Sequence, residues 1–205
     1  MTQVRSILGY HDAFKTLCDR RLIQSMYSEC DELMERVLLT LHGQAHAERR
    51  AIELKLFRRD FIHYYERTIY PITLEKVLKP YLNEGRMDLS LFGKQVNINL
   101  SADLAGIDLP EESSDLTSLL ISIVAKFGEG ATLFHSTRDK SQVRQEVGEA
   151  LFKFDTYFFQ PSFLRRQQLL REVASNDRSE LDVPRDILST LIAKRDSHQL
   201  DEGMI

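Results

Sequence analysis

Two histidines four residues apart, His42 and His46, are the first side chains whose types and spacing could support chemistry. On a helix this spacing places both imidazoles on one face, as in the zinc site of metalloproteases. Such a site also needs a glutamate directly after the first histidine as general base, and here that position is Gly43. A third ligand is not evident from the sequence. The pattern therefore argues against zinc.

A second pattern shares one of these histidines, in the stretch Gly43-x-x-His46-x-x-x-Arg50. His46 and Arg50 lie on one face of the basic helix that the spacing predicts over 44–57. A neighbouring imidazole and guanidinium can hold a carboxylate or a phosphate in an apolar setting. The alternative is an ordinary pair of solvent-facing polar residues, and spacing alone leaves both interpretations open.

Composition narrows the function classes. Twenty-seven basic and 31 acidic residues give a net charge of −4, which provides no overall attraction for nucleic acid or anionic lipid. No apolar run is long enough to predict a membrane span. Cys18 and Cys30 are too few for a disulfide framework and indicate reduced thiols in a cytoplasmic protein. No Ser-His-Asp relay, phosphate-binding glycine loop or paired-carboxylate site can be argued from the spacing.

The elements that must position these residues are helices. Apolar residues recur three and four apart, which predicts a mainly α multi-helix array with at most one short strand, at Val4–Leu8. Pro71 is expected to kink or split one helix, and Pro161 to interrupt another. Without a repeat or a long linker, residues 1–205 form a single partial domain. The predicted helices begin near Tyr10, Ser28, Gln44, Asp60, Leu89, Asp115, Gln142 and Asp182. Ser28, Asp60 and Asp182 are the predicted caps, and two helices are expected to end at Gly85 and Gly106.

The order of several motifs adds a family resemblance. Leu38–Arg50 resembles the start of the third helix of the haem-thiolate monooxygenases, the cytochrome P-450 superfamily. Val4–Phe14 is similar to that family's strand, glycine turn and early helix. Ala102–Ile107 resembles its "Leu-x-Gly-Ile/Val" helix end, and Asp186–Asp196 its "Asp-Leu-Leu-x-x-Leu" helix. The likeness runs collinearly from about residue 4 to residue 205.

The resemblance implies the front half of the cytochrome P-450 fold. In that family the matching histidine and arginine contact a haem propionate, so His46 and Arg50 are the candidate residues for binding haem b. The two helices placed at 115–136 and 140–159 line the family's substrate channel, and Gly128 and Gly130 are expected to let that region flex. The candidate substrate contacts there are Phe127, Leu133, Phe134 and His135.

The family's iron-binding cysteine loop has no counterpart here, since neither Cys18 nor Cys30 lies in a Phe-x-x-Gly-x-x-x-Cys context. The implied function is oxygen insertion into an apolar small molecule, with electrons from a ferredoxin- or flavin-type partner. As a fragment without the thiolate ligand, this chain alone is expected to be inactive. The alternative is a non-catalytic, all-helical ligand-binding or interaction protein of the regulator type.

Overall fold

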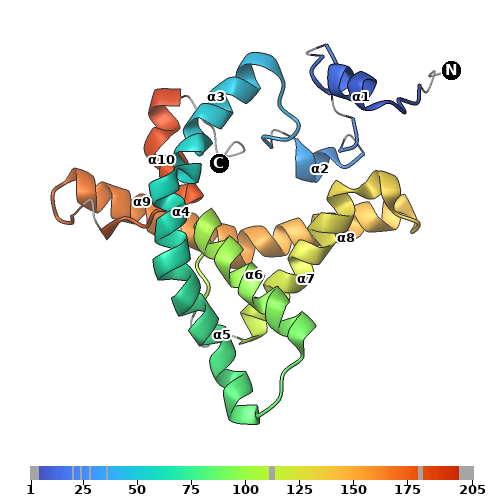
Figure 1. Cartoon of the computed structure of the whole chain (residues 1–205). Coiled ribbons are helices and arrows are strands. Elements are labelled where there is room, and N and C mark those ends of the chain that lie inside the picture. The colour runs from blue at the N-terminus through green and yellow to red at the C-terminus, as the bar shows by residue number, and fades with distance from the viewer. Residues whose placement is uncertain are drawn as a thin grey trace.

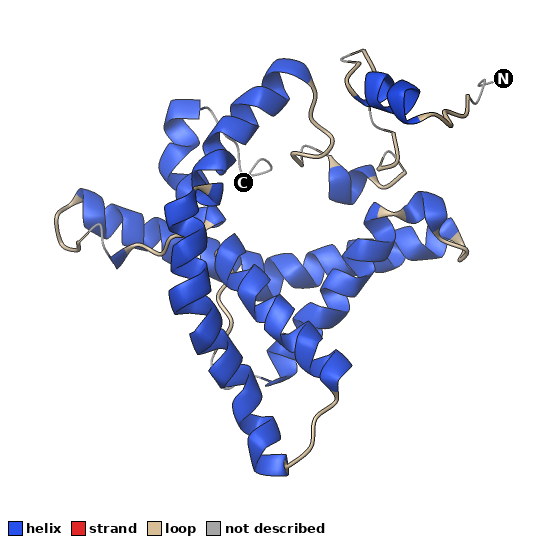
Figure 2. Cartoon of the chain, in the orientation of Figure 1, coloured by secondary structure: helices blue, strands red, loops and turns tan. Residues whose placement is uncertain are grey.

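Helices make up the regular structure of this chain (Figure 2). The computed structural model describes residues 5–19, 21–23, 25–27, 29–35, 37–110, 114–179 and 182–198. Within those ranges no strand is formed, so the predicted mainly α class is confirmed; the short strand is not seen at 5–8, and Val4 lies outside the described residues. The helices are α1 Tyr10–Leu17, α2 Asp31–Met34, α3 Gly43–Glu53, α4 Arg59–Tyr64, α5 Tyr70–Glu84, α6 Leu89–Ala105, α7 Ser114–Ala131, α8 Lys140–Phe154, α9 Gln160–Ala174 and α10 Ile187–His198.

Two long helices each contain a π-turn directly before a proline. The turn Tyr65–Ile69 joins α4 to α5 ahead of Pro71, and the turn Asp155–Phe159 joins α8 to α9 ahead of Pro161. Each wide turn shifts the hydrogen-bond register by one residue, which relieves the clash between the proline ring and the preceding turn. The predicted interruption at Pro161 is therefore wrong, and both helices continue through their prolines.

The first predicted helix after residue 28 is much shorter than expected. The pattern favours a helix to residue 38, but α2 ends at Met34. The Thr40 hydroxyl donates to the carbonyl oxygens of Met34 (2.7 Å) and Val37 (2.9 Å). Such side-chain bonds compete with helix continuation, which explains the early end. The predicted cap, Ser28, lies outside the described residues.

Helix ends are partly as the sequence predicts. Gly85 and Gly106 end α5 and α6 with left-handed backbone (φ 68° and 89°), as expected for glycine at these positions. Asp60 is not a cap but lies in the first turn of α4. Nor does Asp182 cap the last helix: Asp186 does, accepting a hydrogen bond from the Ser189 amide at 2.6 Å. An aspartate nearer the apolar run competes better for this role because a cap bonds amides only two or three residues ahead.

The hydrophobic core lies where α6, α7, α8 and the second π-turn meet. α7 and α8 run side by side as a hairpin, and α6 crosses them (Figure 1). A second, smaller cluster joins the hairpin's far end to the segment before α2. The buried residues of the main cluster are Ile98, Ala102, Ile107, Leu120, Ile123, Ala150 and Phe158.

A buried ion network ties three segments together behind this core. The Arg166 guanidinium on α9 donates to Asp186 (2.9 Å), which caps α10, and to Asp108 (2.8 Å), in the loop after α6. The Arg166 and Asp186 side chains are 6% and 2% exposed. Ser162 joins the network by accepting from the Asp108 amide at 2.9 Å. Because both charges of a buried pair must be matched, the network fixes α9 against both neighbours.

The array is open. The chain exposes 14,754 Å², whereas a compact monomer of this mass exposes about 9,900 Å². α1 lies apart from the main array at one end of Figure 1. Large apolar side chains remain exposed along several helices, including Leu17, Phe57, Ile72 and Leu89. Among the described residues, no helix has both the length and the apolar character needed to cross a bilayer.

Replacing Arg166 with methionine should lower the free energy of unfolding by about 3–5 kcal/mol, because it leaves the buried Asp186 carboxylate without its cationic partner. Arg165→Met is the matched control. Arg165 also pairs with Asp108, at 2.7 Å, but its side chain is 59% exposed. Its loss should cost less than about 1 kcal/mol. Urea unfolding of both variants is the measurement, and equal losses would contradict a dominant role for the buried pair.

Gly106→Ala should destabilise the chain more than Gly85→Ala. Both glycines have positive φ, so each substitution costs about 1–2 kcal/mol of backbone strain. A Cβ at Gly106 would also lie 2.6 Å from the Asp186 carboxylate and 2.7 Å from Leu188 Cβ, whereas Gly85 has nothing within 4 Å. Crowding should add about 1–3 kcal/mol at Gly106 only. Thermal and urea unfolding compare the two; similar costs would show that the contact relaxes freely.

Candidate functional site

The two residues of the predicted anion-binding couple lie on one helix. His46 and Arg50 both fall within α3, one turn apart, so their side chains emerge from the same face. His46 is half-buried and Arg50 is exposed. Neither side chain has a hydrogen bond or an ion pair to a described residue. The couple therefore has free donors for an anionic group.

The neighbouring polar residues of α3 are already occupied. Arg49 pairs with Glu53, one turn ahead, and both side chains are largely buried. Glu48 accepts a hydrogen bond from Gln44 at 2.8 Å. These pairs satisfy one side of the helix internally. Arg50 is thus the arginine of this helix that remains available to a ligand.

A metal site at the histidine pair is not supported. His42 is the N-cap residue of α3 with an extended backbone, so it precedes the helix that carries His46. No group of three or more His, Cys, Asp or Glu side chains able to hold a metal lies within the described ranges. Cys30 is buried, as predicted for a structural thiol, and Cys18 is exposed.

The predicted substrate contacts on the hairpin fall into two groups. Leu133 is 1% exposed in the cluster with Cys30, and Phe127 packs edge-to-face with Phe154 in the core. Phe134 is 61% exposed and contacts His135 edge-to-face. The structure therefore places only the second pair on the surface. Contact of any of the four with a substrate stays a prediction.

The end of the hairpin is held by ion pairs. Arg138 bridges Glu129 (2.8 Å) on α7 and Glu146 on α8, and Lys126 also pairs with Glu146 at 2.9 Å. Hydrogen bonds from Arg138 and then Lys126 lower the pKa of Glu146 to about 2. The stabilisation is therefore present above the ordinary glutamate value of 4.5 and is lost as pH falls toward 2.

The expected flexibility at Gly130 is not what the packing indicates. Gly130 is buried, and a Cβ there would lie 2.5 Å from Val147 on α8. The glycine allows close approach of two helices, which rigidifies the hairpin. Gly128 has open space around it and makes no such contact.

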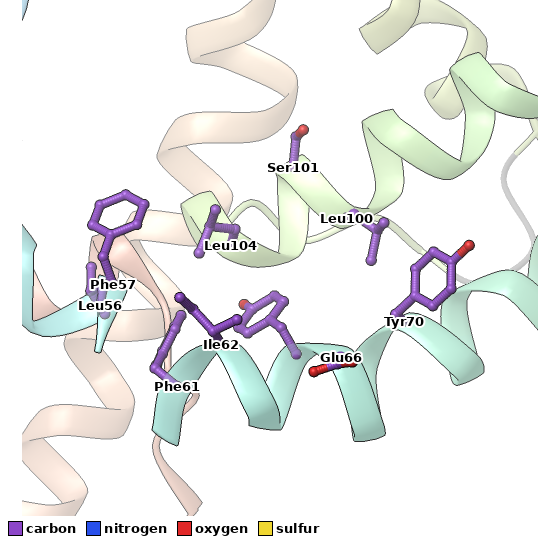
Figure 3. A pocket seen from close by; sticks show the side chains of 10 residues that line it. Leu56, Phe57, Phe61, Ile62, Glu66, Tyr70, Leu100, Ser101 and Leu104 are labelled. Carbon is purple, nitrogen blue, oxygen red and sulfur yellow. The ribbon is translucent and has the colours of Figure 1, made fainter. Parts of the chain in front are cut away.

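An apolar groove lies between the α4–α5 segment and α6 (Figure 3). Its volume is about 410 Å³, and the first π-turn forms part of its wall. Three of its aromatic and aliphatic side chains, Phe57, Ile62 and Tyr70, are about half exposed. Apolar residues at helical spacing on both helices were the available signal, but the sequence does not show that α6 faces α4. The lining is Leu56, Phe57, Phe61, Ile62, Tyr65, Glu66, Tyr70, Leu100, Ser101 and Leu104.

The deep side of this groove borders charged residues. Tyr65 donates a long hydrogen bond (3.4 Å) to the carbonyl of Arg185. Burial, with the nearby charges of Asp103 and Asp186, raises the pKa of Tyr65, so the phenol stays neutral. Burial also raises the pKa of Asp103, against the opposing effect of Lys76. The groove is therefore lined mainly by apolar side chains, with the neutral Tyr65 phenol among them.

Comparisons with protein-family models, with curated proteins and with solved structures each gave no match to this chain.

Arg138→Gln should loosen the turn that joins α7 to α8, because it removes the ion pairs of Arg138 with Glu129 and Glu146 and leaves only the Lys126–Glu146 pair among the bridges described above. Amide hydrogen exchange at 132–139 is expected to become roughly fivefold faster, corresponding to loss of a modest ion-pair network. Arg171→Gln is the control, since Arg171 bonds only Gln167 on its own helix. Mass spectrometry of exchange measures the effect; unchanged rates in Arg138→Gln would show that packing alone holds the turn.

Proposed function

We propose that this chain is the cofactor-anchoring and substrate-covering front half of a haem-thiolate monooxygenase-like protein. In this role His46 and Arg50 hold a propionate of haem b. The observation that carries the proposal is the pair of unpartnered donors on one face of α3, beside an arginine that is internally paired. An imidazole and a guanidinium one turn apart can hold a carboxylate more firmly than either alone.

The donor set fits the acidic edge of haem b but not its iron. Cys30 is enclosed by Leu133, Val143 and Val147, and Cys18 is an exposed residue at the end of α1. Bound haem would supply oxygen activation for insertion into an apolar small molecule. The residues of this chain would position the cofactor edge, and a thiolate ligand would come from elsewhere.

The open surface supports the same proposal. The excess exposed area and the apolar groove along α4 and α6 are expected of helices that pack against further apolar structure. The exposed basic side chains Arg58 and Arg59 would face an acidic ferredoxin- or flavin-type electron donor, whose association would be salt-sensitive.

A second candidate function is a non-catalytic helical interaction protein. The apolar groove favours it, because its exposed Phe57, Ile62 and Tyr70 provide an apolar surface against which a third helix would pack. In this interpretation His46 and Arg50 would be ordinary surface residues. The two functions differ in whether the chain recognises the carboxylates of a porphyrin.

Titration of the chain with protoporphyrin IX and with its dimethyl ester, followed by tyrosine fluorescence quenching, tests the proposal. The free acid should bind about tenfold more tightly than the ester, because only the acid makes charge-assisted hydrogen bonds. His46→Ala and Arg50→Ala should each remove most of that preference. A carbon-monoxide difference spectrum of the haem-treated chain should show no thiolate band.

Arg59→Ala is the matched control, since Arg59 is an exposed arginine on α4 and not on the couple's helix. It should leave the preference for the free acid intact. Equal binding of acid and ester by the unaltered chain, or equal losses in Arg50→Ala and Arg59→Ala, would favour the interaction protein.

A further inference from the structure

A second pocket lies next to the apolar groove, and the two share lining residues. Its volume is about 360 Å³, and it is bounded by the start of α4, the end of α9, the loop before α10 and the first turns of α10. Leu56 and Phe61, both almost fully buried, line this pocket as well as the groove. Residues 56–61 and lining residues between 170 and 193, which are far apart in sequence, thus build a concave site of the size that small ligands occupy.

The floor of the pocket is apolar. Leu170 from α9, Val183 from the connecting loop and Ala193 from α10 complete the surface begun by Leu56 and Phe61. None of these five side chains carries a polar atom, so the floor offers dispersion contacts and desolvation to a hydrocarbon. A purely ionic ligand would gain nothing from it.

One wall carries a buried hydroxyl with no partner. Ser189 is 4% exposed, and within the described ranges its Oγ makes no hydrogen bond. Its backbone amide is already used by Asp186, and the neighbouring Thr190 hydroxyl donates to the Asp186 carbonyl at 2.8 Å. A buried hydroxyl without a bond is costly, so this wall keeps one unsatisfied donor within the described part of the chain.

The rim has a net positive charge. Arg58 and Arg185 line the pocket together with Asp60. The Arg58–Asp60 contact is long, at 3.7 Å, and both side chains are more than 70% exposed, so water screens it strongly. The Arg185 guanidinium lies 5.5 Å from the centre of the Tyr64 ring, which orients it without neutralising it. Two guanidinium groups therefore face one weakly engaged carboxylate.

We propose that this pocket binds a monoanionic amphiphile, a carboxylate on a saturated hydrocarbon chain. The hydrocarbon lies on the floor formed by Leu56, Phe61 and Leu170. The carboxylate accepts hydrogen bonds from Arg58 and Arg185 at the rim. The two features select together: the floor disfavours a bare inorganic anion, and the rim disfavours a neutral hydrocarbon or a cation.

The pocket is separate from the two residues proposed to hold the haem propionate, since His46 and Arg50 are not among its lining residues. The inference therefore does not depend on the proposed function. It concerns a site that would bind its ligand whether or not the chain anchors haem.

Isothermal titration calorimetry of the 205-residue chain with sodium decanoate tests the proposal, with 1-decanol and sodium acetate as the neutral and tail-less probes. Decanoate should give saturable binding at one site per chain, and neither other probe should. Arg58→Gln and Arg185→Gln should each weaken decanoate binding by about tenfold, since each removes a charge-assisted bond. Ala193→Phe, which fills the pocket, should abolish it.

Two further variants keep the result interpretable. Arg59→Gln removes the same charge next to Arg58 but does not line the pocket, so decanoate affinity should be unchanged. Asp60→Asn removes the competing carboxylate and should tighten binding by a few-fold. Circular dichroism and thermal unfolding confirm that each variant is folded. Absence of saturable decanoate binding, equal binding of decanol, or equal losses in Arg58→Gln and Arg59→Gln would overturn the proposal.

Discussion

The buried guanidinium of Arg166 is the constraint on which the arrangement of the helices depends. A charge taken out of water is tolerated only where its partners are close and correctly oriented, and here those partners come from two other segments. Asp108 follows α6 and Asp186 begins α10, so α9 must pass between them. Gly106 completes the junction, because a side chain there would collide with the Asp186 carboxylate.

That junction positions every surface with a possible function. α10 packs against α3, the helix of His46 and Arg50, and also against α9. The first turns of α10 supply Ser189 and Ala193 to the polar-rimmed pocket, while Leu56 and Phe61 separate this pocket from the apolar groove. The two π-turns also contribute to this arrangement. They let the long helices pass their prolines without a break, which keeps the groove continuous along α4 and α5.

The exposed apolar area and the available hydrogen-bond donors of His46 and Arg50 on α3 are features that a bound ligand or a partner would cover. A porphyrin edge and further apolar helices would satisfy both features together, and a partner helix alone would satisfy only the groove. The hairpin of α7 and α8 is a stiffer element than its two glycines suggest, since Gly130 seals a helix–helix contact and Arg138 bridges the hairpin's end. Any substrate contact there would fall to Phe134 and His135, which are exposed.

The sequence alone determined the helical class, the left-handed ends at Gly85 and Gly106, and the shared face of His46 and Arg50. These depend on interactions between residues within one or two turns, which spacing reveals directly. Competition between local interactions, which spacing alone did not resolve, decided the short α2, the continuous helices at Pro71 and Pro161 and the cap at Asp186. The tertiary structure decided the burial of Leu133, and it alone created the groove and the pocket. Burial and partner choice depend on which segments meet in space, and a buried charge such as Arg166 finds its partners 20 and 58 residues away, beyond any local pattern.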